Sequence, residues 1–311
     1  MAPVKISVIG AGFVGAAVAN TLLASGLASE IVLVDKNREK AVGESLDIGQ
    51  SAPFVKPTDV YAGDESDCKG SSIIVFTAGA NQGPNETRLD LSAKNAEIIK
   101  DSIPKLVASV PEAIFLMVTN PVDVMTYLAL KTSGLPKEKV IGSGTILDTS
   151  RFRYSLSNYL QVDARNIHAY IVGEHGDSEV ALWSMTNVAG IGLEDFCHLN
   201  NLQIPEKAKI LEEVKNAAYK IIETKGATYY AISYGVRRIC EAILRDERSV
   251  LTVSSLVDGI YGIKETCLTL PCIVSRKGVE KVINLSLSED EQQALIDSAN
   301  VIKKYQDAMK L

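Results

Sequence analysis

Two of the three histidines in this 311-residue chain fall within thirteen residues, "HAYIVGEHGDSEV" at 168–180. The second, His175, directly follows Glu174 and precedes a Gly-Asp pair. Histidine has an ordinary pKa near neutral pH, which makes it a common group for passing protons in enzymes. His175 is therefore a candidate for acid–base chemistry, and other parts of the chain must supply its partners.

Charged side chains that could be those partners occur in two other segments. In "GTILDTSRFRY" (144–154), Asp148 and Arg151 are one helical turn apart and share a face. The polar segment "GANQGPNETRLDL" (79–91) lies between a buried strand and a helix. Its composition is typical of a mobile lid, and it carries Arg88 near its end. Taken alone, a surface ion pair and a solvated charge would explain these residues.

The segment "GAGFVG" places Gly10, Gly12 and Gly15 in the order G-x-G-x-x-G, after a predicted strand and at the start of a predicted helix. In that context Gly10 permits the turn, Gly12 lets the backbone approach a pyrophosphate, and Gly15 lets the helix pack closely on the strand. The unpaired N–H groups of the helix N-terminus would face the phosphates. The spacing predicts a dinucleotide site, with a plain tight turn as the alternative.

Asp35 closes the second predicted strand. A carboxylate there can accept hydrogen bonds from the adenosine ribose hydroxyls and would repel a 2′-phosphate. The pattern therefore favours NAD over NADP.

The first half of the chain alternates predicted strands and helices. Strands are expected at 4–10, 30–35, 72–80, 113–120 and 139–144, and Gly26 is expected to end the first helix. The runs at 72–80 and 113–120 are almost continuously apolar, which indicates burial on both faces, as in a parallel sheet covered by helices. Residues 1–143 are thus predicted to form an α/β domain with a Rossmann-type, doubly wound parallel sheet.

The second half has a different pattern. Helices are expected at 145–160 and within 206–245, and strands at 167–172, 249–257 and 267–275. The segment "SEDE" (288–291) is a capping box that opens a last helix, whose apolar face carries Leu295, Ser298, Ala299, Ile302 and Met309. Residues 144–311 are predicted to form an α+β domain that binds the substrate.

Composition narrows the classes of function. The chain is 46% hydrophobic and 23% charged with a net charge of -6, which fits a soluble globular protein and disfavours nucleic acid or an anionic membrane as partner. No apolar run approaches the roughly 20 residues that span a bilayer, and no signal peptide is expected. Five scattered cysteines indicate reduced thiols, hence a cytoplasmic location. The three histidines form no cluster with metal-ligand spacing.

Together these motifs resemble the family of lactate and malate dehydrogenases, which act on 2-hydroxy acids. The segments "GAGFVG", "VTNPVD", "GSGTILDTSRFR" and "GEHGDS" occur in that family's order and spacing, and the resemblance covers roughly residues 4 to 305. Several motifs in register are far more specific than any one of them. The resemblance implies an NAD-dependent oxidoreductase.

The resemblance also implies a role for each polar residue. His175 is the proton donor and acceptor, and Asp148 is the carboxylate that orients it. Arg151 grips the substrate carboxylate, Arg88 polarises the carbonyl, and Asn120 contacts the nicotinamide and the substrate oxygen. Such a set suits reduction of a 2-keto acid, because hydride goes to carbon while oxygen gains a proton.

A further set of residues is expected to contact NAD, on the same resemblance. It combines the glycine loop, the acidic residue after the second strand, and the ends of the next two strands. The set is Gly10, Gly12, Phe13, Val14, Gly15, Asp35, Thr77, Ala78, Gly79 and Asn120.

In this family, the choice between lactate and malate as substrate depends largely on the lid position six residues before Arg88. Malate dehydrogenases carry arginine there to meet a second carboxylate, whereas this chain has the neutral Gln82. Thr228 also resembles the lactate-type residue on the far wall of the site. Both favour pyruvate and lactate. Pro84 and Asn85 depart from the commonest lactate-type lids, so malate or a broader range of 2-keto acids is the alternative.

Two expectations concern assembly and regulation. By position, Arg153 and His168 match a basic pair that binds the activator fructose 1,6-bisphosphate at a subunit interface in bacterial lactate dehydrogenases. A structural salt bridge and a structural histidine are the alternative. The family forms homodimers or homotetramers, and a tetramer is expected here.

A non-catalytic dinucleotide-binding protein is disfavoured because His175, Asp148 and both arginines are present.

Overall fold

The computed structural model describes residues 3–80 and 88–309, with only the backbone described at 88–90. Six parallel strands lie side by side in the order β3-β2-β1-β4-β5-β6. This is the doubly wound order of dinucleotide-binding folds, in which the strand order reverses between β1 and β4. The strands are β1 (Lys5–Ile9), β2 (Glu30–Val34), β3 (Asp59–Gly63), β4 (Ile73–Phe76), β5 (Ile114–Met117) and β6 (Val140–Gly142).

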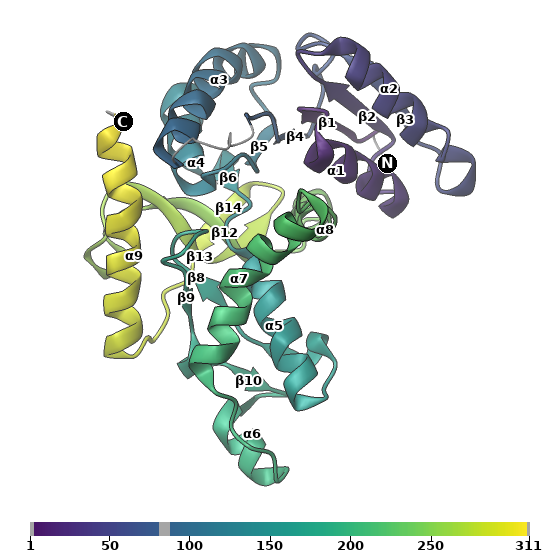
Figure 1. The fold of residues 1–311 in the computed structure, drawn as a ribbon. Helices are drawn as coiled ribbons and strands as arrows, with labels where there is room; N and C mark the ends of the chain where they lie inside the picture. The colour runs from purple at the N-terminus through teal and green to yellow at the C-terminus, as the bar shows by residue number, and fades with distance from the viewer. Residues whose placement is uncertain (1–2, 81–87, 310–311) are drawn as a thin grey trace.

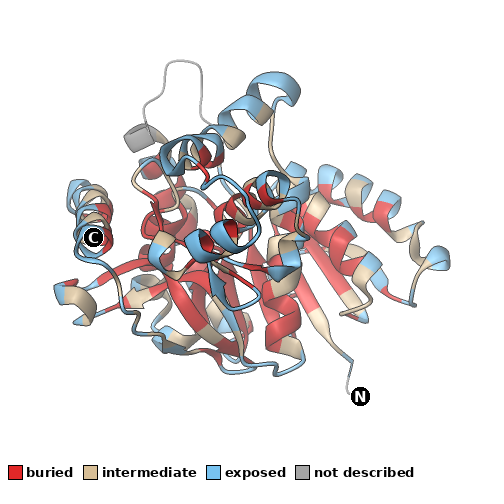
Figure 2. Ribbon diagram, turned by 90° about the horizontal axis from the view of Figure 1, so that it is seen from below, coloured by how far each residue is buried: buried red, intermediate tan, exposed pale blue. Residues whose placement is uncertain are grey.

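Helices cover both faces of this sheet. Successive strand side chains point to opposite faces, so Ile74 and Phe76 of β4 join one core cluster while Ile73 and Val75 join the other. The first cluster is completed by α3 (Arg88–Ser109), α4 (Val122–Ser133) and α9 (Glu289–Ala308). The second is completed by α1 (Phe13–Ser25), α2 (Arg38–Gly49) and α8 (Tyr230–Leu244). Figure 2 shows the buried strands between helices whose outer faces are exposed.

The main sheet continues into the C-terminal half of the chain. Strand β12 (Ser249–Val257) pairs antiparallel with β6 at Ser254 and Gly142, and β13 (Thr266–Ser275) and β14 (Gly278–Val282) follow, also antiparallel. The result is a nine-stranded mixed sheet that crosses the predicted domain boundary at 143/144. The boundary itself stays a prediction.

Apart from α8 and α9, which pack on the main sheet, the rest of the C-terminal half extends away from it (Figure 1). It has its own core, built from the inner faces of α5 (Ile146–Leu160) and α7 (Lys207–Lys225). Its smaller elements are β7 (Ile167–His168), β8 (Ile171–Val172), β9 (Val180–Ala181), β10 (Asn187–Val188), β11 (Ile191–Gly192) and α6 (Leu193–Leu199). Short 3-10 helices lie at Ala52–Phe54, Lys137–Lys139, Ala164–Asn166, Trp183–Met185 and Ile260–Gly262.

The helix signals read from the sequence are confirmed at two places. Gly26 ends α1 in the left-handed conformation, with φ of 61°. Ser288 and Glu291 form the capping box of α9. The Rossmann-type α/β fold predicted from the apolar runs is thus the fold that forms.

The strand expected at 167–172 is wrong as a single element. Ile167–His168 pairs with β10, whereas Ile171–Val172 pairs with β9 in another sheet. The apolar residues of the segment indicated a strand, but a local pattern could not show that the chain changes sheets between the two pairs of residues. In the part of the chain that the structure describes, no helix is long and apolar enough to cross a membrane.

Candidate active site

One buried carboxylate links the two polar motifs that the sequence singled out. Asp148 Oδ2 lies 2.5 Å from Nδ1 of His175, and Asp148 Oδ1 accepts a hydrogen bond of 2.8 Å from Arg151 Nη1. The Asp148 side chain is only 3% exposed, whereas the His175 side chain is 26% exposed. A surface ion pair is excluded by that burial. The imidazole keeps its Nε2 edge for a reacting molecule, since Nδ1 is taken by Asp148.

Local structure explains why Asp148 and Arg151 meet. Both belong to the first turns of α5, three residues apart, and therefore project from the same face of the helix. An acidic side chain is favoured in the first turn of a helix because it faces the positive end of the helix dipole. The guanidinium of Arg151 is then held beside the imidazole by the carboxylate that both contact.

The site raises the proton affinity of His175. Burial alone would lower the pKa of the imidazole, but the charge and hydrogen bond of Asp148, together with the charges of Asp123 and Glu179, raise it to about 9. Burial would likewise raise the pKa of Asp148, yet His175 and Arg151 hold it below its ordinary value. The imidazolium–carboxylate pair is therefore the stable state at neutral pH in this ligand-free structure.

Three elements hold the main chain around His175. The backbone N–H of His175 donates to Asp123 Oδ2 of α4 at 2.8 Å, and the N–H of Glu174 donates to Ser298 Oγ of α9 at 2.8 Å. Gly173 and Thr269 of β13 exchange a pair of backbone hydrogen bonds. The loop that carries the histidine is thus fixed from three sides.

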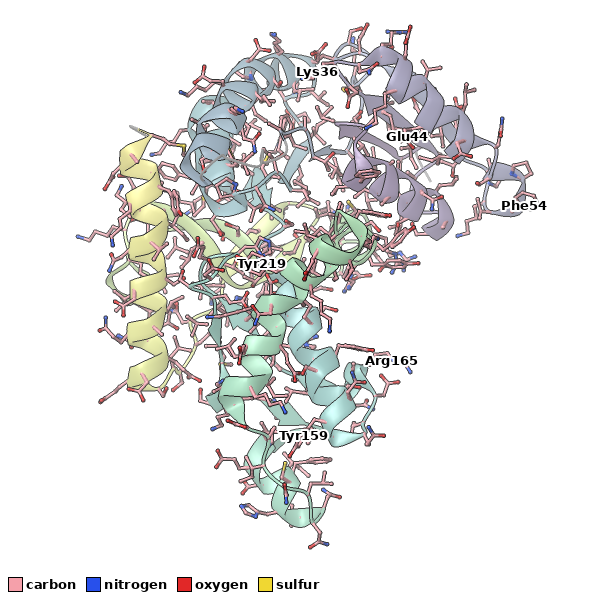
Figure 3. All side chains as sticks on the ribbon, in the orientation of Figure 1. Lys36, Glu44, Phe54, Tyr159, Arg165 and Tyr219 are labelled. Carbon is pink, nitrogen blue, oxygen red and sulfur yellow. The ribbon has the colours of Figure 1, made fainter. Side chains whose placement is uncertain are left out.

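Helix α7 supports the same loop one step further along the chain. Lys215 Nζ donates to the carbonyl of Asp177 at 2.7 Å, and the hydroxyl of Tyr219 donates to the Asp177 carboxylate at 2.9 Å. Figure 3 labels Tyr219 where α7 approaches the main sheet. The position of His175 therefore depends on contacts with helices distant in sequence.

Asp123 is a residue that the sequence reasoning missed. It lies in the first turn of α4, within "VTNPVD", and its side chain is buried. Its Oδ1 atom has no hydrogen-bond partner among the described residues, and burial raises its pKa to about 6. An acidic residue directly after Asn-Pro-Val at a helix start was a usable signal, but only Asn120 of that motif was assigned a role.

The glycine loop has the geometry that its spacing predicts. Gly10 has φ of 100°, a conformation that favours glycine, and a Cβ at Gly15 would overlap the carbonyl oxygen of Gly10. Gly12 caps α1 without a side-chain hydrogen bond, and a Cβ there would meet nothing within 4 Å. Open space in front of an uncapped helix N-terminus fits a pyrophosphate.

Asp35 faces the glycine loop from the end of β2. Its Oδ2 accepts from the N–H of Ala11 at 2.7 Å and its Oδ1 from the N–H of Asn37 at 2.8 Å. Each carboxylate oxygen has a further lone pair that a ribose hydroxyl could use. The residues present therefore fit NAD.

The other predicted cofactor residues border the same loop. Thr77 donates to the carbonyl of Gly10 at 3.0 Å, and the carbonyl of Ala78 accepts from Thr119 at 2.7 Å. Phe13 is 68% exposed and stacks on Tyr229 with ring centroids 5.5 Å apart. The remaining members lie beside these: Val14 follows Phe13 in α1, Gly79 follows Ala78, and Asn120 follows Thr119 as an exposed residue after β5.

The structure describes three predicted substrate residues to different extents. Gln82 lies outside the described residues, and Arg88 is described only as the backbone that begins α3. Thr228 lies half-buried in the turn between α7 and α8, next to the Tyr229 that stacks on Phe13. The structure thus brings His175, Asp148 and Arg151 together directly.

The predicted regulatory pair lies on neighbouring segments. Arg153 Nε donates to the carbonyl of Ala169 at 3.0 Å, and its guanidinium lies over the ring of Tyr170 at 5.3 Å. Burial lowers the pKa of Arg153. His168 is exposed in β7, one residue before Ala169.

A dinucleotide-binding sheet beside a buried imidazole–carboxylate–guanidinium cluster defines a nicotinamide-dependent dehydrogenase as the class of protein. Comparison with family models agrees: residues 4–142 match the NAD-binding domain of lactate/malate dehydrogenases, and residues 145–310 match the α/β C-terminal domain of the same family. The chain belongs to the lactate/malate dehydrogenase family and uses NAD.

Individual relatives match over nearly the whole chain. The L-lactate dehydrogenase of Acetivibrio thermocellus is 54% identical over 96% of this chain and 95% of its own. L-lactate dehydrogenase 1 of Clostridium acetobutylicum is 53% identical over 98% of both chains. Among solved structures, a lactate dehydrogenase from a Medee basin deep-sea metagenome library superposes with a TM-score of 0.96, 40% identity and 100% coverage of both chains. The minor L-lactate dehydrogenase of Enterococcus mundtii, in a ligand-bound form, superposes with a TM-score of 0.95, 40% identity and 98% coverage of both chains.

Proposed function

We propose that this chain is an L-lactate dehydrogenase that interconverts pyruvate and lactate with NADH and NAD, and that His175 passes the proton. The observation that carries the proposal is the buried Asp148 carboxylate, which contacts the His175 imidazole and the Arg151 guanidinium at once. The relatives that bear the name L-lactate dehydrogenase support the same activity. None of the relatives described above bears the name malate dehydrogenase, which is the alternative activity within the family.

Proton transfer follows from the charge state of the site. His175 is protonated at neutral pH because its pKa lies at about 9, so it can give the Nε2 proton to the carbonyl oxygen of pyruvate. When bound, NADH supplies the hydride that goes to the carbonyl carbon. The imidazole left behind is neutral and regains a proton from solvent. In the reverse direction, neutral His175 accepts the hydroxyl proton of lactate.

The other side chains bind and orient the substrate. Arg151 offers its remaining N–H groups to the substrate carboxylate, and a planar guanidinium fixes such a group by paired hydrogen bonds. Arg88 stabilises the negative charge that develops on oxygen. Asn120 contacts the substrate oxygen and the nicotinamide. The neutral side chains of Gln82 and Thr228 suit a methyl group and would give a second carboxylate no cationic partner.

The direct test compares two keto acids at equal concentration. NADH oxidation should be fast with pyruvate and at least about tenfold slower with oxaloacetate, because enclosing an unpaired carboxylate is costly. NADPH should replace NADH poorly, since Asp35 would repel the 2′-phosphate. A preference for oxaloacetate would overturn the assignment of substrate, whereas no oxidation with either acid would overturn the activity.

Assembly, regulation and location belong to the same proposal. Exposed apolar side chains on and after α2 support assembly into a homo-oligomer: Leu46 is 59% exposed, and Phe54, labelled in Figure 3, is 88% exposed. The resemblance to the family favours a homotetramer. Fructose 1,6-bisphosphate would activate the enzyme by binding Arg153 and His168, and a lower KM for pyruvate in its presence would support this. Five free, buried cysteines support a reducing, cytoplasmic location. A role in fermentative glycolysis rests on the proposed activity with pyruvate.

A further inference from the structure

Asn95 of α3 joins the two loops that border the nicotinamide side of the predicted cofactor site. Its Oδ1 accepts the backbone N–H of Ala80, after β4, at 2.8 Å. Its Nδ2 donates to the backbone carbonyl of Asn120, after β5, at 2.7 Å. These partners are 15 and 25 residues away in sequence, so neither bond is a local feature of the helix.

The two bonds fix the side chain without ambiguity. A backbone N–H can only donate and a carbonyl can only accept, so the amide oxygen must face Ala80 and the amide nitrogen must face Asn120. The side chain is 2% exposed. Burying an amide is unfavourable unless both ends are paired, and here each end is paired with main chain rather than with another movable side chain.

Packing around Asn95 leaves little room for another arrangement. A Cβ built on Gly79 would lie 3.2 Å from Asn95 Oδ1 and 2.8 Å from Thr119 Cγ2. Thr119 in turn donates to the carbonyl of Ala78 at 2.7 Å. The described part of the loop after β4, residues 77–80, therefore packs against Asn95 and the end of β5, and these contacts set its position relative to Asn120.

The turn at residues 120–123, which Asn95 contacts, also contains the residue that binds the backbone of His175. Asn120 is followed three residues later by Asp123, which accepts the backbone N–H of His175. A continuous series of hydrogen bonds and short backbone links thus runs from Ala80 through Asn95 and the 120–123 turn to His175. Reduction of a keto acid needs the nicotinamide side and the proton donor in one geometry, and this series connects them.

We infer that Asn95 is a positioning residue for hydride transfer, which holds Asn120 and the loop after β4 in register with the His175 loop. The inference rests on the proposed function, because it concerns the geometry of that reaction. Both hydrogen bonds of the Asn95 side chain described above go to main-chain atoms, of Ala80 and of Asn120. Asn95 acts through the main chain of these residues.

Two variants distinguish the effects of the two Asn95 hydrogen bonds. N95D keeps an acceptor for the Ala80 N–H but loses the donor to Asn120 and sets a carboxylate against its carbonyl. N95L removes both bonds at similar volume. Both should lower kcat for pyruvate reduction, N95D by about 100-fold if Asn120 shifts by around 1 Å. Only N95L should also raise KM, since only N95L releases the loop after β4.

The matched control is T132V, which deletes hydrogen bonds from the Thr132 hydroxyl to carbonyls within its own helix α4.

Each protein is measured for Tm, for NADH binding by fluorescence, and for the isotope effect on kcat with NADH deuterated at the transferred position. A positioning role predicts a raised isotope effect in N95D with NADH binding kept, and no change in T132V. Parent-like kcat and isotope effect in folded N95D and N95L would overturn the inference. A parent enzyme inactive with pyruvate would instead overturn the proposed function.

Discussion

The charge of His175 is set by three carboxylates that differ in their contacts. Asp148 bonds the ring directly, Asp123 bonds the backbone N–H of the same residue, and Glu179 lies buried nearby. Burial and the charge of Asp148 raise the pKa of Glu179 to about 8. Because Asp148 also contacts Arg151, a single substitution at Asp148 would change orientation and charge together. Asp123 allows charge to be tested alone.

D123N should move the pH dependence of pyruvate reduction to lower pH. The asparagine keeps an acceptor for the His175 N–H, but it removes a charge that raises the pKa of the imidazole. Reduction needs the protonated ring, so kcat/KM is present below the pKa of His175 and is lost as pH rises through it. The falling limb, near pH 9 in the ligand-free parent, should therefore move down in D123N. An unchanged limb would contradict the role given to the Asp123 charge.

Contacts between candidate site residues were predictable from the sequence where motifs indicated them. The association of His175 with Asp148 and Arg151 followed from family resemblance, and the structure brings these residues together. Asn95 could not be found in the same way. A single asparagine inside a polar helix has no periodic signal, and its partners are backbone atoms that only the fold brings close.

Helix α9 shows how one element combines stability with positioning. Ser288 caps its N-terminus and Glu291 completes the capping box, while Glu291 also bonds Ser184. Ser298, ten residues after Ser288, accepts the N–H of Glu174, the residue directly before His175. The two serines therefore have separable functions on the same helix.

S288A should lower the free energy of unfolding by about 1 kcal/mol, the usual cost of losing an N-cap side chain, and should leave kcat nearly unchanged. S298A should lower kcat because it frees the backbone beside His175. Denaturant titration and steady-state kinetics on both variants give the comparison. Equal losses of kcat in the two variants would argue against separate functions.

Elements were predictable where their pattern was strong. Buried parallel strands such as β4 and β5 read directly as apolar runs, and β12 was placed at the residues that form it. The edge strand β3, "DVYAG", is only partly buried and is not a continuous apolar run, so it lacked that signal. The division of 167–172 between two sheets depends on long-range pairing, which no local pattern specifies.

At the scale of the molecule, the sheet joins the cofactor half to the half that carries His175. β12 extends the parallel sheet beyond β6, and Thr269 of the neighbouring β13 bonds Gly173 in the histidine loop. The glycine loop and the His175 loop are thereby connected through one continuous sheet. The outer faces, in contrast, leave apolar side chains uncovered on α2.

L46E should reduce the size of the assembly. Leu46 is 59% exposed on α2 in the single chain, and a carboxylate placed in an apolar subunit contact would be left unpaired. Sedimentation should show the parent as an oligomer and the variant shifted towards smaller species. E44Q on the same helix, labelled beside α2 in Figure 3, is the control and should sediment like the parent. A parent that sediments as a monomer would contradict the proposed assembly.

The central claim is that His175 passes the proton in pyruvate reduction, and H175N tests it most directly. Asparagine can hydrogen-bond but cannot exchange a proton near neutral pH, so kcat for NADH oxidation by pyruvate should fall by about 10²–10⁴-fold. NADH binding, followed by fluorescence, should remain near that of the parent because the glycine loop and Asp35 are untouched. Turnover of H175N within a few-fold of the parent, measured with pyruvate at saturation, would contradict the account.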